Sequence, residues 1–156
     1  MSYVAESRQE FYGMYKISEI AKIFPSIDFH LYGLKNTEFR TTSNVHFHGW
    51  VTPEVFAESL KSTPIFLRLT DHDGFSVSVI EALAYGCEVI MSLPFDITHL
   101  ATTTEEAIDK IKMLSTKIEA RGMTPNHTLI EAVKVRFNPE IIARNYIQKI
   151  KEIVSK

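Results

Sequence analysis

The segment that most constrains the fold spans residues 71–90, with the sequence DHDGFSVSVIEALAYGCEVI. It reads as the end of a strand, a glycine loop, a helix and a second strand, an order typical of α/β domains. Asp73 and Glu81 lie eight positions apart in it. If the helix begins near Ser76, Asp73 lies in the loop ahead of it and Glu81 in its second turn, facing the crevice above the sheet. One ligand could then contact both carboxylates.

The start of this helix is a predicted anion site. The backbone N–H groups of Phe75, Ser76 and Val77 lack partners within the helix, and the helix dipole favours negative charge there. A nucleotide sugar has the matching layout, because its diphosphate would lie over the helix start while its ribose and hexose each reach one carboxylate. Glu81 lies among apolar residues, so we expect it to be buried and to need partners such as ribose hydroxyls.

The same segment resembles the E-x7-E region of retaining GT-B glycosyltransferases, which typically reads E-G-F-G, four residues, then E-A-M/L-A-x-G. Asp73 stands where the family usually has a glutamate. Residues 24–33 and 44–51 resemble the family's second and third strands, and residues 137–153 resemble its closing helix. The chain is therefore similar to the C-terminal, donor-binding domain of the glycosyl transferases group 1 family. The resemblance implies retaining transfer of a hexosyl group from a nucleotide diphosphate sugar, without a metal or other cofactor.

The resemblance also implies roles for residues in the loops at the carboxyl ends of the strands. Asp73 would contact a sugar hydroxyl and Arg8 would pair with the diphosphate, which makes these two the catalytic candidates. Glu81 would bind the ribose. The other candidate donor-binding residues are Gly74, Phe75, Ser76, Gly33, Gly49, Trp50, Val51, His72 and Lys16.

Several of these candidates have a simpler reading. Arg8 could be an unpaired surface arginine, His72 a solvated loop residue and Trp50 ordinary core. Two departures from the family pattern also put the donor site in doubt. Tyr12 stands where a phosphate-binding lysine is usual, and residues 91–96 replace a glycine-rich segment. His46 and His48 share a strand face, but without a cysteine or carboxylate at ligand spacing they do not predict a metal site.

Length and composition limit what the chain can do alone. Its 156 residues suffice for one domain, residues 1–156, and not for two Rossmann-like domains. We therefore expect an acceptor-binding domain elsewhere, in a longer chain or a separate subunit, and no glycosyl transfer by this chain in isolation. A net charge of −2 gives no electrostatic case for nucleic acid. No apolar run or signal peptide is present, so the expected compartment is cytoplasmic, with any peripheral membrane association made through the partner domain.

Strand and helix patterns alternate along the chain. They predict an α/β fold with a doubly wound, parallel, Rossmann-like sheet of five or six strands, corresponding to half of a GT-B fold. The closing helix is expected at about residues 139–154, with an apolar stripe larger than one domain can cover. The single cysteine, Cys87, is expected to be buried. The alternative function is a non-catalytic interaction or regulatory module with a degenerate donor site; an unrelated flavodoxin-like signalling domain is a weaker third reading.

Overall fold

A computed structural model describes residues 1–74 and 76–154. Its six strands form one sheet in the order β3-β2-β1-β4-β5-β6, and every neighbouring pair is parallel. The predicted doubly wound, Rossmann-like sheet is therefore confirmed. The strands are β1 Ser2–Tyr3, β2 Phe29–Tyr32, β3 Val45–Gly49, β4 Ile65–Arg68, β5 Glu88–Met91 and β6 His99–Leu100.

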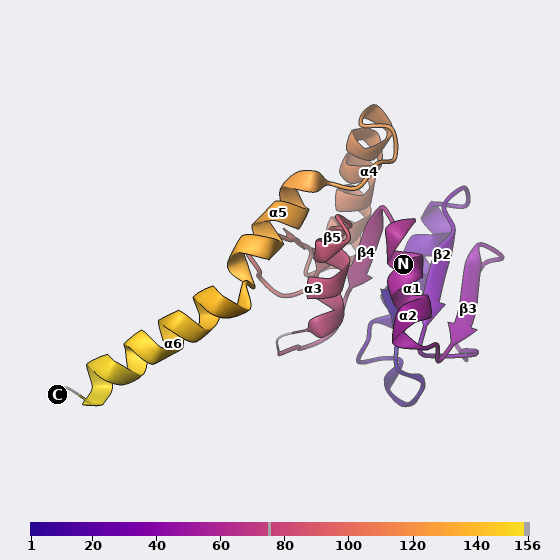
Figure 1. Cartoon of the computed structure of the whole chain (residues 1–156). Helices are drawn as coiled ribbons and strands as arrows, with labels where there is room; N and C mark the ends of the chain where they lie inside the picture. Colours follow the sequence, from indigo (N-terminus) through magenta and orange to yellow (C-terminus); the bar gives the residue numbers. More distant parts are fainter. Residues whose placement is uncertain (75, 155–156) are drawn as a thin grey trace.

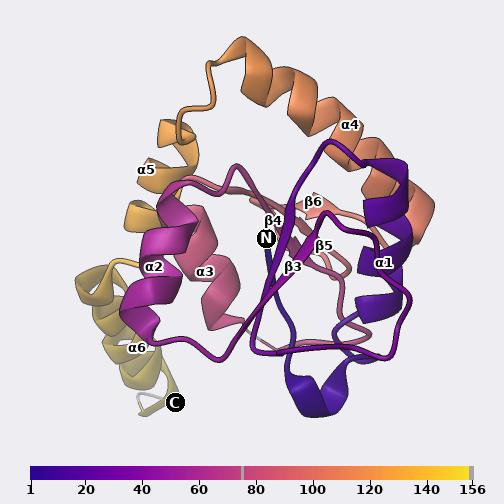
Figure 2. The ribbon, with the colours of Figure 1, turned by 90° about the vertical axis from the view of Figure 1, so that its right-hand side faces the viewer.

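Helices cover both faces of the sheet (Figure 2). One face carries α1 and α4, and the other carries α2, α3 and α5 (Figures 1 and 2). The helices are η1 Glu6–Arg8, α1 Met14–Ile23, α2 Pro53–Lys61, α3 Val77–Ala84, α4 Thr104–Ala120, α5 His127–Arg136 and α6 Pro139–Val154.

Helix starts follow the capping residues in the sequence. The side chain of Thr52 accepts a hydrogen bond at the start of α2, and Asn126 does the same for α5. Thr103 and Glu106 form a capping box at α4. α4 continues to Ala120, and Ile118 extends its buried apolar face one turn beyond Leu114.

Two hydrophobic cores lie on the two faces of the sheet. Alternate residues of β2 show the division, since Phe29 and Leu31 pack with α1 and α4 while Tyr32 packs with the α2 and α3 side. Cys87 is fully buried in the second core, as predicted, and burial raises the pKa of its thiol to about 12.

The last helix, α6, projects away from the rest of the chain (Figure 1). None of its residues is buried. The predicted apolar stripe is exposed along its whole length; it consists of Ile141, Ile142, Tyr146, Ile150 and Ile153. Over residues 1–74 and 76–154, no helix combines the length and apolar character needed to cross a membrane.

Candidate active site

The main cleft lies at the carboxyl edge of the sheet, where the strand order reverses between β1 and β4. Its volume is about 490 Å³. Its walls come from the ends of β1, β2 and β4 and from the starts of α2 and α3. The lining residues are Tyr3, Tyr12, Tyr32, Gly33, Trp50, Val51, Pro53, Phe56, Arg68, Asp73, Ser76, Val77, Ser78 and Glu81.

A buried ion pair forms the charged part of this cleft. Arg68 is the last residue of β4, and its Nε donates a hydrogen bond to Asp73 Oδ2 over 2.6 Å. Their side chains are only 8% and 12% exposed. The guanidinium also lies over the ring of Tyr12, 4.8 Å from its centroid. Asp73 is thus already paired with a cation.

Aromatic side chains make up much of the cleft wall. Tyr32 meets Phe56 edge to face, with the ring centroids 5.5 Å apart. Trp50 is 73% exposed, so its interpretation as core is wrong. Gly33 N–H donates to Gly49 C=O over 2.7 Å, which ties the loops after β2 and β3 together. Both glycines have positive φ, of 94° and 66°, which other residues rarely adopt.

The start of α3 opens into the same cleft. Ser76 is its N-cap residue but makes no capping hydrogen bond through its side chain. Its hydroxyl lies instead 3.1 Å from that of Ser78. Because Ser76, Val77 and Ser78 all line the cleft, the uncapped end of the helix faces a ligand-sized space. Phe75, also predicted here, lies outside the described residues.

Glu81 lines the cleft, but the predicted burial of its side chain was wrong. The residue is exposed. Its neighbours Ala82 and Leu83 face the core, so the helix turns Glu81 outward to the opening of the cleft. Its carboxylate makes no hydrogen bond within the described parts of the chain, which leaves both carboxylate oxygens available to a ligand.

Other predicted donor residues do not line this cleft. Arg8 is exposed at the end of η1 with its guanidinium 6.0 Å from the ring of Phe11. Lys16 lies on α1, above Tyr15. His72 is exposed and packs edge to face against Phe11. The remaining two are Gly49, which is buried, and Gly74, which lines an adjacent hollow of about 170 Å³.

Sequence reasoning missed Arg68. A charged residue at the end of the apolar run 64–69 was the available signal, because a strand buried on both faces is normally apolar throughout. It also missed Tyr3, Tyr12, Tyr32 and Phe56, whose aromatic character fits a core equally well.

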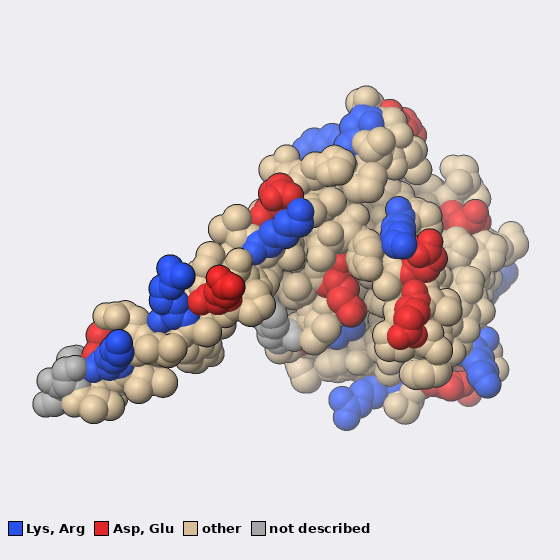
Figure 3. Space-filling model, viewed as in Figure 1, with Lys and Arg blue, Asp and Glu red and all other residues tan. Residues whose placement is uncertain are grey.

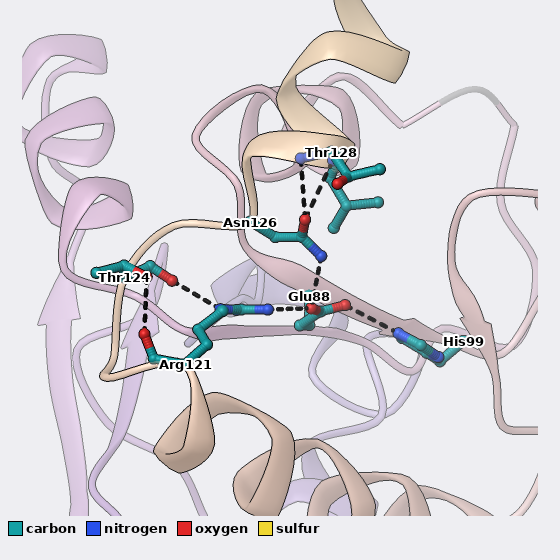
Figure 4. A network of polar contacts seen from close by, with 7 residues as sticks. Glu88, His99, Arg121, Thr124, Asn126 and Thr128 are labelled. Carbon is teal, nitrogen blue, oxygen red and sulfur yellow. Dashed lines mark hydrogen bonds and ion pairs between the residues drawn. The ribbon is translucent and has the colours of Figure 1, made fainter.

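A second polar cluster lies at the opposite, amino-terminal edge of the sheet (Figure 4). Glu88, the first residue of β5, accepts hydrogen bonds from His99, Arg121 and Asn126 over 3.0, 2.8 and 2.9 Å. These bonds, that from His99 foremost, lower the pKa of Glu88 to about 2 although burial acts in the opposite direction. The cluster joins β5 to β6, to the end of α4 and to the start of α5.

Three histidines stack on the edge strand β3 and its neighbour β2. His30 lies between His46 and His48, with ring centroids 5.0 and 5.1 Å away. Burial, followed by the neighbouring histidines, lowers the pKa of His30 and of His48. His46 contacts Asp28 at 2.9 Å. No group of three or more His, Cys, Asp or Glu side chains in the described residues is arranged to hold a metal ion.

Three solved structures share the fold of this chain. No protein-family model matches the sequence, and no curated protein sequence matches it. The structure of Anabaena Alr3699/HepE in complex with UDP-glucose superposes with a TM-score of 0.68 at 13% identity, over 97% of this chain and 48% of that one. Pneumococcal O-GlcNAc transferase GtfA in complex with UDP and GlcNAc gives 0.56 at 15% identity, over 99% and 36%. The GtfA/B complex gives 0.53 at 12% identity, over 90% and 36%.

At these identities the comparisons show the fold, which is glycosyltransferase-like. The chain spans about half of the Alr3699/HepE chain and about a third of the GtfA chain. The predicted resemblance is therefore confirmed at the level of the fold.

Proposed function

We propose that this chain binds a nucleotide diphosphate sugar in the main cleft and supplies the donor half of a retaining hexosyltransferase. One observation carries the proposal. Asp73, Ser76 and Glu81, which the sequence singles out, line one cleft at the switch point of a glycosyltransferase-like sheet. That cleft combines aromatic walls, an open helix start and carboxylates, the groups that a base, a diphosphate and sugar hydroxyls require.

The proposed binding mode follows the cleft from its outer wall to its charged part. The base packs near Trp50 and Val51, which lie beside the positive-φ turn at Gly49. The ribose hydroxyls donate to the exposed carboxylate of Glu81. The diphosphate lies at the start of α3, and the hexose reaches Asp73, whose Oδ1 is not used by the ion pair.

The proposed chemistry requires stabilisation of charge on the departing diphosphate. The helix start and a nearby cation supply it electrostatically, without a metal ion, so EDTA should leave donor binding unchanged. The acceptor comes from a separate domain, since the similar proteins are two to three times longer than this chain. The isolated chain should therefore show no transfer. We propose the cytoplasm as the compartment, with any membrane association made by the partner domain.

One observation favours the second candidate, a non-catalytic module of the same fold. Asp73 is neutralised by Arg68 before any ligand binds. If the hexose cannot compete for this carboxylate, the site could bind nucleotides without turnover or bind no donor at all.

The test is calorimetric titration of the chain with UDP-, GDP- and ADP-linked hexoses. We expect one of them to bind with micromolar to millimolar affinity, because an isolated half-site lacks the closing domain. Glu81→Gln should weaken binding of the donor and of the free nucleoside diphosphate together, by roughly 1 to 3 kcal/mol. Asp73→Asn should weaken only the sugar donor.

The matched control is Glu58→Gln, an exposed glutamate of α2 outside the cleft lining, which should leave binding unchanged. Absence of saturable heat with every nucleotide sugar would favour the non-catalytic module.

A further inference from the structure

We propose that Arg68 is the residue that binds the diphosphate. The inference rests on the proposed function for the identity of the full ligand, but its evidence is the state of this one side chain. Arg68 is 7% exposed, yet it lines the cleft. A buried guanidinium that faces a ligand-sized space requires an account of each of its donors.

Most donors of Arg68 have no protein partner. A guanidinium carries five N–H groups. Only Nε is used, in the hydrogen bond to Asp73, and the two Nη groups make no hydrogen bond to any residue in the described part of the chain. The Nη atoms are not among the fully buried side-chain atoms that lack a partner, which are Gln9 Oε1 and Thr70 Oγ1 in the described residues, so they are open to the cleft and available to an acceptor from outside the protein.

The side chain is also held in place for such an acceptor. Asp73 fixes Nε at 2.6 Å, and the ring of Tyr12 supports the guanidinium at 4.8 Å. The planar fork is thereby oriented before the ligand arrives, which suits two-point binding of a phosphate group.

The charges of the lining residues also indicate which side chain can bind an anion in this cleft. Among the described residues that line the cleft, Arg68 is the only cation, and Asp73 and Glu81 are acids. An anionic ligand in this cleft therefore depends on Arg68. Arg8 and Lys16, the cations expected from sequence, do not line the cleft.

The start of α3 provides a second, separate anion contact. Ser76, Val77 and Ser78 line the same cleft, and the side chain of the N-cap residue Ser76 makes no capping hydrogen bond. One phosphate on the Nη groups and a second at the helix start would use both contacts at once. This favours a diphosphate over a single phosphate or a carboxylate.

The test compares ligands that differ only in their phosphates. Wild type and Arg68→Met are titrated by calorimetry with UDP, GDP and ADP, with the corresponding nucleosides, and with inorganic pyrophosphate. We expect Arg68→Met to weaken the nucleoside diphosphate that binds, and pyrophosphate, by about 10- to 150-fold. Binding of the parent nucleoside should change less than about twofold, which separates lost phosphate contacts from general damage to the cleft. Arg144→Met, at an exposed arginine of α6 outside the cleft lining, is the matched control and should bind every probe as wild type does.

Arg68→Met leaves Asp73 buried without its partner and could unfold the chain, so two further variants accompany it. Arg68→Lys keeps the charge and loses the fork, and should weaken the nucleoside diphosphate by about 5- to 10-fold. The double variant Arg68→Met with Asp73→Leu removes both charges together and should fold, with phosphate binding still lost.

The outcomes separate the two proposals. Wild-type affinity for the nucleoside diphosphate in folded Arg68 variants would overturn the inference while the proposed function stands. Arg68-dependent binding of pyrophosphate without binding of any nucleotide would support the inference and overturn the proposed function. If wild type binds neither nucleotide nor pyrophosphate, both are wrong.

Discussion

Two arginine–carboxylate pairs, one buried and one partly buried, lie at opposite edges of the same sheet and differ in how many of their polar atoms have partners. At the amino-terminal edge, Glu88 accepts from three side chains, and Arg121 also donates from Nε to Thr124 C=O (Figure 4). At the carboxyl edge, Arg68 and Asp73 share one hydrogen bond and face a cleft. In the first arrangement both carboxylate oxygens of Glu88 have partners and Arg121 binds through Nε and Nη1, whereas in the second neither Nη group of Arg68 has a partner among the described residues.

The geometry of the parallel sheet explains where each pair lies. At the carboxyl edge, the ends of β1, β2 and β4 meet the start of α3. The positive end of the α3 dipole therefore lies beside the loops that follow these strands. The amino edge receives the ends of helices, and Arg121 caps α4 with a favourable positive charge. Elsewhere charge is dispersed, with acidic and basic side chains interspersed over the face in Figure 3. The two buried charged residues of the described chain, Arg68 and Glu88, therefore lie at opposite edges, and Arg68 lines the main cleft.

The largest expected effect is on stability at the amino edge. Glu88→Gln removes the buried charge that Arg121 and His99 share and should lower the free energy of unfolding by about 2 to 4 kcal/mol, because it leaves the partly buried cation Arg121 poorly paired. Urea denaturation measures this change. Glu131→Gln is the control, since Glu131 pairs with Lys134 at 2.7 Å but both side chains are about two-thirds exposed. It should cost at most about 0.5 kcal/mol. An equal loss of unfolding free energy in Glu88→Gln and Glu131→Gln would contradict the proposed difference between the buried cluster and an exposed ion pair.

Lowering the pH should reversibly remove the stabilisation that the Glu88 carboxylate contributes. The pKa of Glu88 is lowered from 4.5 to about 2, so its stabilisation is fully present above pH 4.5 and is lost as the pH falls toward 2. The difference in unfolding free energy between wild type and Glu88→Gln should therefore shrink by roughly 2 to 3 kcal/mol over this interval. Denaturant titrations at several pH values measure it, and groups common to both proteins cancel. A difference that stays constant down to pH 2 would show that Glu88 is not the group responsible.

Much of the fold could be predicted from the sequence because the signals are local. Pro53 after Thr52, the alternation of β2 and the glycine loop before α3 each fix an element on their own. The cleft and the two ion pairs could not be predicted from such local signals. Arg68 and Asp73 are close in the chain, but their bond depends on the path of the loop. The Glu88 cluster joins residues up to 38 positions apart.

The sequence predicted carboxylates and a helix start that line the cleft, but it did not predict that Arg68 lines it. Asp73, Ser76 and Glu81 belong to one short motif, so their spacing determines that they meet. The diphosphate contact of Arg8 was predicted from its position in a loop. That position determines at which edge of the sheet the residue lies, but not in which direction its long side chain points. Glu81 was expected to be buried because its neighbours are apolar, yet a helix in contact with the sheet on one side exposes the other.

The smallest expected effect is on the unfolding free energy of variants at two helix starts. One helix start, that of α4, is capped by a side chain, and the other, that of α3, is not capped by the side chain of its N-cap residue. Thr103 caps α4, since its hydroxyl accepts from Glu106 N–H while the Glu106 carboxylate accepts from Thr103 N–H. Thr103→Ala should therefore cost about 1 kcal/mol of unfolding free energy. Ser76→Ala at α3 removes only the contact to Ser78 and should cost less than about 0.5 kcal/mol.

Urea denaturation of both variants in the absence of ligand measures this difference. Added nucleoside diphosphate provides the sharper comparison, because an anion at the start of α3 would stabilise the Thr103→Ala variant as much as wild type. A cost for Ser76→Ala equal to that for Thr103→Ala would mean that Ser76 caps α3 in solution. The start of α3 would then lose an open donor, and the proposed diphosphate site would depend on Arg68 alone.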